Sequence, residues 1–159
     1  MSTSTQEKVP VSLSRAGLDD LDALAQLFDA YRVFYRQAPD HAGARAFLDE
    51  RLRLGESTIF LARDAATGAA LGFTQLYPAF SSVRARRIWI LNDLFVAPEA
   101  RGRGVACALM STARAFAIET GALRLVLETA EDNAPAQALY ESLGYAREAG
   151  TRHYSLELA

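Results

Sequence analysis

The segment from Asn92 to Ala106 constrains the fold of this chain more than any other part of the sequence. An apolar run ends at Pro98, a short polar turn follows, and the run from Arg101 to Ala106 contains two glycines and two arginines. Apolar residues then recur at the spacing of one helix face. They are Val105, Leu109, Met110, Ala113, Phe116 and Ala117. The pattern predicts a strand, a glycine-rich turn and the start of a helix.

A turn of this kind can bind an anion. Its glycines leave consecutive backbone N–H groups exposed at the positive end of a helix dipole. A diphosphate can bind to these groups. A P-loop would require Lys and Ser or Thr after its last glycine, whereas Val105 and Ala106 follow Gly104. A dinucleotide-binding loop would require a third glycine near the start of a βαβ unit. An ordinary turn before a helix remains the alternative.

Three segments together resemble the GCN5-related N-acetyltransferases. Arg101 to Ala106 fits the family's Gln/Arg-x-x-Gly-x-Gly/Ala signature, which holds the pyrophosphate of acetyl-coenzyme A. Ile88 to Val96 is similar to the family's central strand, and Asn133 to Tyr145 is similar to its Asn-x-x-Ala-x-x-Leu-Tyr-x-x-x-Gly-Phe/Tyr segment. The order and the spacing of the segments also fit, and the resemblance covers residues 8–159.

The resemblance implies a fold and an activity. The fold is a single-domain mixed α/β structure over residues 9–159, with a mainly antiparallel sheet, splayed central strands and flanking helices. The activity is transfer of the acetyl group of acetyl-coenzyme A to a primary amine, by direct attack in a ternary complex. We expect a small-molecule amine. The alternatives are a protein or peptide N-acetyltransferase and a non-catalytic domain that binds acyl-coenzyme A.

The resemblance also implies which residues bind the cofactor. The backbone of the central strand would meet the pantetheine arm, and an N–H near Phe95 or Val96 would polarise the thioester carbonyl. The expected cofactor-binding residues are Leu94, Phe95, Val96, Arg101, Gly102, Arg103, Gly104, Val105, Ala106, Asn133 and Tyr140. Asn133 before Pro135 equally suits the start of a helix, and both roles are compatible.

Tyr140 and Asp93 are the expected catalytic residues. Tyr140 aligns with the family's general acid, and a pKa of about 10 keeps a tyrosine protonated at neutral pH; packing against the sheet is the alternative. Many relatives carry Glu where this chain has Asn92, and an amide cannot accept a proton. Asp93 then relays the proton through water, or the amine arrives neutral, or Asp93 is a structural carboxylate. Cys107 has no histidine partner, which argues against a covalent acetyl carrier.

The acceptor site is expected to be formed by the first two helices and the loop before the central strand. Aromatic and cationic residues cluster at the end of the first helix: Tyr31, Arg32, Phe34, Tyr35 and Arg36. They form a lid over the acceptor or cap the helix end. Tyr31, Phe34, Tyr35 and Asn92 are the expected substrate contacts. The guanidinium groups favour an acceptor that carries a carboxylate over a polycation.

Bulk properties restrict the remaining functions. The chain has 159 residues, the size of one domain. Its net charge of −2 does not favour binding to nucleic acid. One cysteine excludes an internal disulfide and suits a reducing cytoplasm, and His41 and His153 lack partners at metal-ligand spacing. No apolar run is long enough to cross a membrane. Residues 1–8 are expected to be a disordered leader. A homodimer is compatible with the sequence.

Periodicity and turn residues predict the elements in chain order. Strands are expected at residues 11–13, 58–62, 70–77, 88–96, 123–129 and 153–158. Helices are expected after Asp20, after Asp40 as far as Gly55, from about Gly104 to Thr120, and from about Pro135 to Leu143.

Overall fold

The computed structural model describes residues 10–159, and its contacts divide the chain into two compact units, residues 1–127 and 128–159. The expected leader, residues 1–8, lies outside the described residues. The strands are β1 (Val11–Arg15), β2 (Thr58–Asp64), β3 (Ala70–Ser81), β4 (Arg86–Val96) and β5 (Leu125–Val126). The α-helices are α1 (Leu21–Phe34), α2 (His41–Arg53), α3 (Val105–Glu119) and α4 (Ala134–Ser142).

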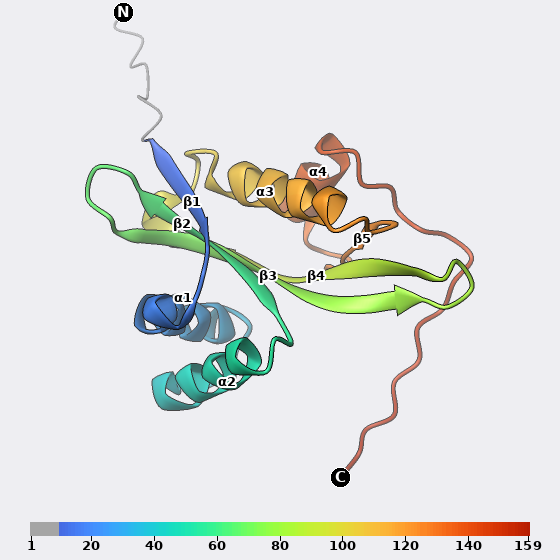
Figure 1. The fold of residues 1–159 in the computed structure, drawn as a ribbon, viewed down its shortest axis with the longest axis horizontal. Helices are drawn as coiled ribbons and strands as arrows, with labels where there is room; N and C mark the ends of the chain where they lie inside the picture. The colour runs from blue at the N-terminus through green and yellow to red at the C-terminus, as the bar shows by residue number, and fades with distance from the viewer. Residues whose placement is uncertain (1–9) are drawn as a thin grey trace, which may run out of the picture. The chain divides into compact units, whose positions relative to one another are not determined.

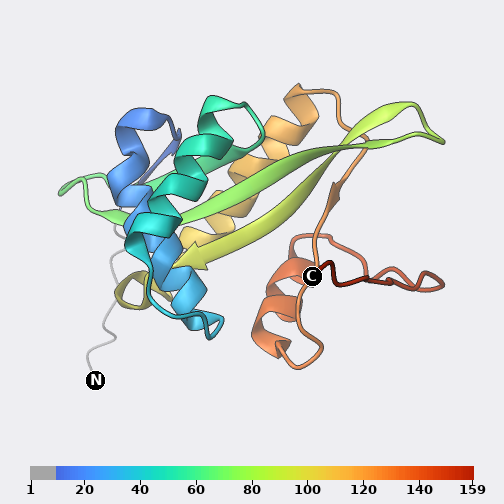
Figure 2. The same ribbon diagram turned by 90° about the horizontal axis from the view of Figure 1, so that it is seen from below.

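The larger unit is a five-stranded sheet in the order β1-β2-β3-β4-β5. The first four strands pair antiparallel, and β5 pairs parallel to β4. Helices α1 and α2 lie on one face of the sheet and α3 lies on the other (Figure 1). In Figure 2, which is seen from below, α1 and α2 lie side by side in front of the sheet. The predicted mixed α/β fold with a mainly antiparallel sheet is therefore confirmed.

The two faces of the sheet are covered by different side chains. Phe28 and Tyr31 of α1 make ring contacts with Phe73 of β3, at centroid distances of 6.1 Å and 5.9 Å. On the other face, the ring centroids of Phe116 in α3 and Trp89 in β4 are 5.0 Å apart. The predicted apolar stripe of α3 is buried at Val105, Leu109, Met110, Ala113 and Ala117. The α1 face of the sheet is therefore packed by aromatic rings, and the α3 face by aliphatic side chains together with the rings of Phe116 and Trp89.

A bulge in β4 reverses which face its side chains point to. Gln75 pairs with Asp93 but Leu76 pairs with Leu91, so Asn92 is an extra residue in β4. Side chains alternate along a strand, and paired residues share a face. Leu91 therefore shares the α3 face with Leu76, whereas Asp93 shares the α1 face with Gln75. Without the extra residue, Asp93 would point towards α3.

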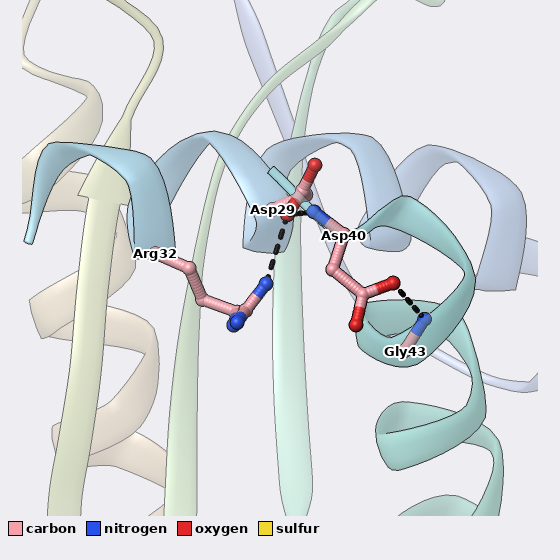
Figure 3. Close-up of polar contacts among 4 residues, drawn as sticks. All are labelled: Asp29, Arg32, Asp40 and Gly43. Carbon is pink, nitrogen blue, oxygen red and sulfur yellow. Dashed lines mark hydrogen bonds and ion pairs between the residues drawn. The ribbon is translucent and has the colours of Figure 1, made fainter. Parts of the chain in front are cut away.

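Hydrogen bonds fix the connection between α1 and α2 (Figure 3). Asp29 accepts hydrogen bonds from the guanidinium of Arg32 and from the backbone N–H of Asp40, both at 3.0 Å. Asp40 is the N-cap of α2, and its Oδ1 accepts from the N–H of Gly43 at 2.9 Å. Asp29 thus ties the last half of α1 to the residue that starts α2.

The smaller unit, residues 128–159, contains α4. Asn133 is its N-cap, with Oδ1 accepting from the N–H of Ala136 at 3.3 Å, and Pro135 occupies the first turn. This helix matches the predicted one to within a residue at each end. No helix within residues 10–159 has the length and apolar character to span a bilayer.

Two strand predictions near the C-terminus differ from the structure. The strand expected over residues 123–129 pairs only at Leu125 and Val126. The strand expected over residues 153–158 is wrong, because these residues form no regular structure, and Tyr154, Leu156 and Leu158 are exposed. An alternating pattern predicts which face of a strand would be apolar. A strand also needs a partner backbone with which to form hydrogen bonds.

Candidate active site

The predicted glycine-rich turn lies at the N-terminus of α3 and is open. Gly102 and Gly104 have φ values of 76° and 79°, the left-handed region that favours glycine. A Cβ built on either residue would meet no atom within 4 Å. Gly104 is the N-cap of α3 and supplies no side-chain oxygen to the N–H groups of the first helical turn. The turn therefore offers backbone donors and open space, which are the requirements of a diphosphate.

Arg101 holds this turn to its surroundings. Its Nε donates to the carbonyl of Val96 at 3.0 Å. Its guanidinium lies 5.6 Å from the ring centroid of Phe34 and 5.8 Å from that of Phe95. One side chain thus connects the glycine-rich turn, the end of β4 and the end of α1. Arg103, the other arginine of the turn, is exposed.

Among the strands of residues 10–159, none pairs with the second half of β4 on the β5 side. Strand β5 pairs with β4 only at Trp89 and Ile90 and ends at Val126, so it leaves β4 before Asp93. The N–H of Ala97 donates to Leu71 on the β3 side at 2.8 Å. Backbone N–H groups alternate in direction along a strand, so the N–H of Val96 points away from β3. The expected separation of the central strands is thereby present in the larger unit.

Asp93 is a buried carboxylate held by uncharged donors. Gln75 Nε2 donates to its Oδ2 at 2.7 Å, and Asn92 Nδ2 donates to its Oδ1 at 3.1 Å. Thr74 Oγ1 donates to its backbone carbonyl at 2.9 Å. Asp93 is 4% exposed, and no cationic side chain within residues 10–159 forms an ion pair with it. A buried anion without an internal counter-charge is costly, which suits a site for a cationic ligand.

Two tyrosines face this carboxylate. Burial, then the negative charge of Asp93 and a hydrogen bond to it, raise the pKa of Tyr31 well above its usual value. Burial and the charge of Asp93 raise the pKa of Tyr77 to about 12, although Arg51 and Gln75 act in the opposite direction. Both hydroxyls therefore stay protonated at neutral pH.

The aromatic cluster at the end of α1 continues from this carboxylate towards the glycine-rich turn. Tyr31 contacts Tyr35 at 4.9 Å between centroids, and Tyr35 contacts Phe34 at 5.3 Å. Phe34 is 59% exposed and Tyr35 is 52% exposed. Arg32, by contrast, forms an ion pair with Asp29 (Figure 3). The expected substrate contacts Tyr31, Phe34, Tyr35 and Asn92 all lie in the larger unit, whereas the Arg32 guanidinium already has a carboxylate partner.

The predicted residues Asn133 and Tyr140 belong to residues 128–159. Asn133 caps α4, as its sequence position indicated. Tyr140 lies on α4, is half-buried, and its ring lies 6.1 Å from that of Tyr145. Cys107 is exposed on α3. Within residues 10–159, no three histidine, cysteine, aspartate or glutamate side chains are grouped so that they could hold a metal ion.

Sequence reasoning missed Gln75 and Thr74, and it gave Arg101 only a phosphate contact. Gln75 and Thr74 lie in an apolar run, and both are fully buried. Strand alternation places Gln75 on the same face as Phe73 and Tyr77, so a polar residue on a buried face was the available signal. The link from Arg101 to Val96 depends on the tertiary structure, which local spacing does not contain.

Two relatives and one solved structure are similar to this chain over nearly its whole length. The chain is 47% identical over 148 residues to an uncharacterized N-acetyltransferase of Bacillus subtilis, YhfO, covering 93% of this chain and 98% of the relative. It is 35% identical over 149 residues to a probable acetyltransferase of Haemophilus influenzae, covering 94% of this chain and 99% of that protein. A crystal structure of a probable acetyltransferase superposes with a TM-score of 0.89 at 43% identity, covering 93% of this chain and 98% of that one.

The profile of the acetyltransferase (GNAT) family matches residues 24–145. That range runs from α1 through the glycine-rich turn to α4. With the open turn at α3, the separated β4 strand and two similar relatives over nearly the whole chain, the chain belongs to the GNAT family of acetyltransferases.

Proposed function

We propose that this GNAT N-acetyltransferase moves the acetyl group of acetyl-coenzyme A to a primary amine of a small molecule, by direct attack in a ternary complex. Family membership establishes an acetyl-transferring enzyme. The observation that best supports a cofactor site is the open turn at Gly102 and Gly104. This turn places backbone N–H donors at the N-terminus of α3. Bound acetyl-coenzyme A supplies the thioester, and the remaining chemistry falls to residues of this chain.

The cofactor would be held by backbone. The turn from Arg101 to Ala106 would bind the diphosphate, and the unpaired edge of β4 at Leu94 and Val96 would bind the pantetheine arm. Since the N–H of Val96 points away from β3, it is the better of the two expected donors to the thioester oxygen. A preorganised donor of this kind contributes about 3 kcal/mol of transition-state stabilisation. Asn133 would contact the cofactor arm in addition to capping α4.

The acceptor amine would bind on the Asp93 side of β4. An amine arrives as a cation at neutral pH, and Asp93 is a buried carboxylate with no internal counter-charge among the described residues. Asp93 would accept the ammonium proton through a water molecule, and Tyr140 would give its proton to the departing thiolate. Tyr31, Phe34 and Tyr35 would cover the apolar part of the acceptor. The pairing of Arg32 with Asp29 weakens the case for an acceptor that carries a carboxylate.

Calorimetry on Gly104→Asp tests the cofactor site. The substitution adds a side chain and a negative charge at the helix N-terminus, so coenzyme A affinity should fall by about 100-fold or more. Gly121→Asp is the matched control, because Gly121 also has a positive φ with open space but follows the C-terminal end of α3. Arg103→Ala should weaken binding only modestly. Equal coenzyme A affinity in Gly104→Asp and Gly121→Asp would remove the turn from the cofactor site.

A further inference from the structure

Gln75 is a fully buried amide that donates a hydrogen bond to Asp93 and also hydrogen-bonds to Tyr77. It lies on β3 opposite Asp93, and its Nε2 donates to Asp93 Oδ2 at 2.7 Å. Its Oε1 is buried and accepts no hydrogen bond from any described group. Burying half of an amide without a partner is costly, and a leucine would fill a similar volume without that cost. Packing alone therefore does not account for a glutamine at this position.

The neighbouring residue makes a different contact with the same aspartate. Thr74 is also fully buried, and its Oγ1 donates to the backbone carbonyl of Asp93 at 2.9 Å. Thr74 thus stabilises the strand at Asp93, whereas Gln75 acts on the carboxylate itself. Substitutions at these two adjacent residues can therefore affect the backbone and the carboxylate of Asp93 separately.

The other groups around the carboxylate are known from the structure. Tyr31 approaches from α1 and Tyr77 from β3, and Arg51 of α2 acts on Tyr77 while pairing with Glu50 and Glu56. Asn92 donates from the bulge and is exposed, so water can replace its amide. Tyr31 also hydrogen-bonds to Asp93 but is only half-buried, so Gln75 is the fully buried donor to the carboxylate, and solvent cannot replace it. A hydrogen bond to a carboxylate favours its ionised form.

We propose that Gln75 is a positioning residue for acetyl transfer: its buried amide orients the Asp93 carboxylate that takes the ammonium proton, and the pH dependence of turnover therefore depends on Gln75. The inference rests on the proposed function, in which Asp93 takes the ammonium proton through water. Gln75 itself makes and breaks no covalent bond. Its amide remains neutral throughout, and the proton leaves Asp93 to solvent.

The test compares Gln75→Leu, Gln75→Glu and Thr74→Val with the parent. The measurement is kcat/KM for the amine as a function of pH, with the KM for acetyl-coenzyme A and the thermal midpoint taken alongside. Gln75→Leu should lower kcat/KM at neutral pH by about tenfold or more, because the carboxylate loses a charge-assisted donor. Gln75→Glu keeps the side-chain size and places a second carboxyl beside Asp93. Two carboxyl groups at this separation share one proton. The acidic side of the plot of kcat/KM against pH, the acid limb, should therefore shift to higher pH by about one unit or more.

The control and the contradicting results are distinct. Thr74→Val should lower the thermal midpoint and leave the acid limb at the parent's pH. The proposal is overturned if Gln75→Leu and Gln75→Glu keep the parent's acid limb and lose only thermal stability. It is also overturned if Thr74→Val moves the limb as far as Gln75→Glu does.

A second readout needs no turnover. The carbon-13 signal of the Asp93 carboxyl, followed against pH, should change at higher pH in Gln75→Glu than in the parent. An unchanged signal refutes the role of Gln75 even if the enzyme is active. A parent protein that transfers acetyl to no amine refutes the proposed function instead, and the carboxyl signal still decides the inference about Gln75.

Discussion

Burial and the charge of Asp93 raise the pKa values of Tyr31 and Tyr77, so the protein should lose stability at alkaline pH. Folding raises the pKa of Tyr31 above its ordinary value and that of Tyr77 to about 12. Below the unfolded value of about 10, the stabilisation from these protonated hydroxyls is fully present. Above it, the folded state retains protons that the unfolded chain loses, so the free energy of unfolding falls as the pH rises towards 12.

Tyr31→Phe and Tyr77→Phe should therefore each make the alkaline loss of stability shallower. Urea unfolding between about pH 8 and about pH 11.5 measures the slope. Tyr154→Phe, at an exposed tyrosine, is the control and should keep the parent's slope. If all three variants lose stability as steeply as the parent above pH 10, the two tyrosines are not coupled to the buried carboxylate.

Tyr140 carries the proposed general-acid role. Tyr140→Phe keeps the ring, so its contact with Tyr145 and the affinity for coenzyme A should survive. The turnover number should fall by about 100-fold or more, the scale of a positioned acid. Steady-state rates with saturating acetyl-coenzyme A provide the measurement. Turnover at the parent rate would mean that water, not Tyr140, protonates the thiolate.

The start of α2 leaves no room for a side chain at Gly43, because the carboxylate of Asp40 occupies that space. A Cβ on Gly43 would lie 2.7 Å from Cγ of Asp40, the N-cap whose carboxylate binds the Gly43 N–H (Figure 3). Gly43→Ala should therefore destabilise the parent, because the cap must move. In an Asp40→Ala background, which itself costs about 1 kcal/mol, the same change should stabilise the helix by about 0.5–1 kcal/mol.

A double-mutant cycle by urea unfolding checks this reversal of sign. Asp19→Ala, at an exposed acidic residue outside the α2 cap, should leave the effect of Gly43→Ala unchanged. A destabilising Gly43→Ala in both backgrounds would show that Asp40 does not set the spacing at this position.

Elements with a strong local signal were predictable, and those that depend on distant partners were not. Asp40 and Asn133 were recognisable helix starts because a cap acts within three residues. The Asn92 bulge was not, because a bulge is defined by the register against β3. The bulge places Asp93 beside Gln75, so the polar network around the carboxylate also stayed outside the sequence prediction.

At the level of the whole chain, the order of elements and the three resembling segments were enough to predict the family and the mixed α/β fold. The conformation of the glycine-rich turn was predictable for a similar reason, since it depends on neighbouring residues in the sequence. The irregular structure of residues 153–158 was not predictable, because an alternating pattern does not reveal whether a partner backbone is present. The acceptor also stays a proposal, since its contacts come from side chains on separate helices and strands.

Thiol release from acetyl-coenzyme A with a panel of small primary amines tests the proposed reaction most directly. The panel should include a monoamine, a polyamine, an amino acid and an aminated sugar, with a lysine-containing peptide as the protein-type acceptor. We predict amine-dependent thiol release with at least one small molecule, an acetylated product by mass spectrometry, and no acetyl group left on the protein. Coenzyme A binding without release for any acceptor, or release only with the peptide, would contradict a small-molecule N-acetyltransferase.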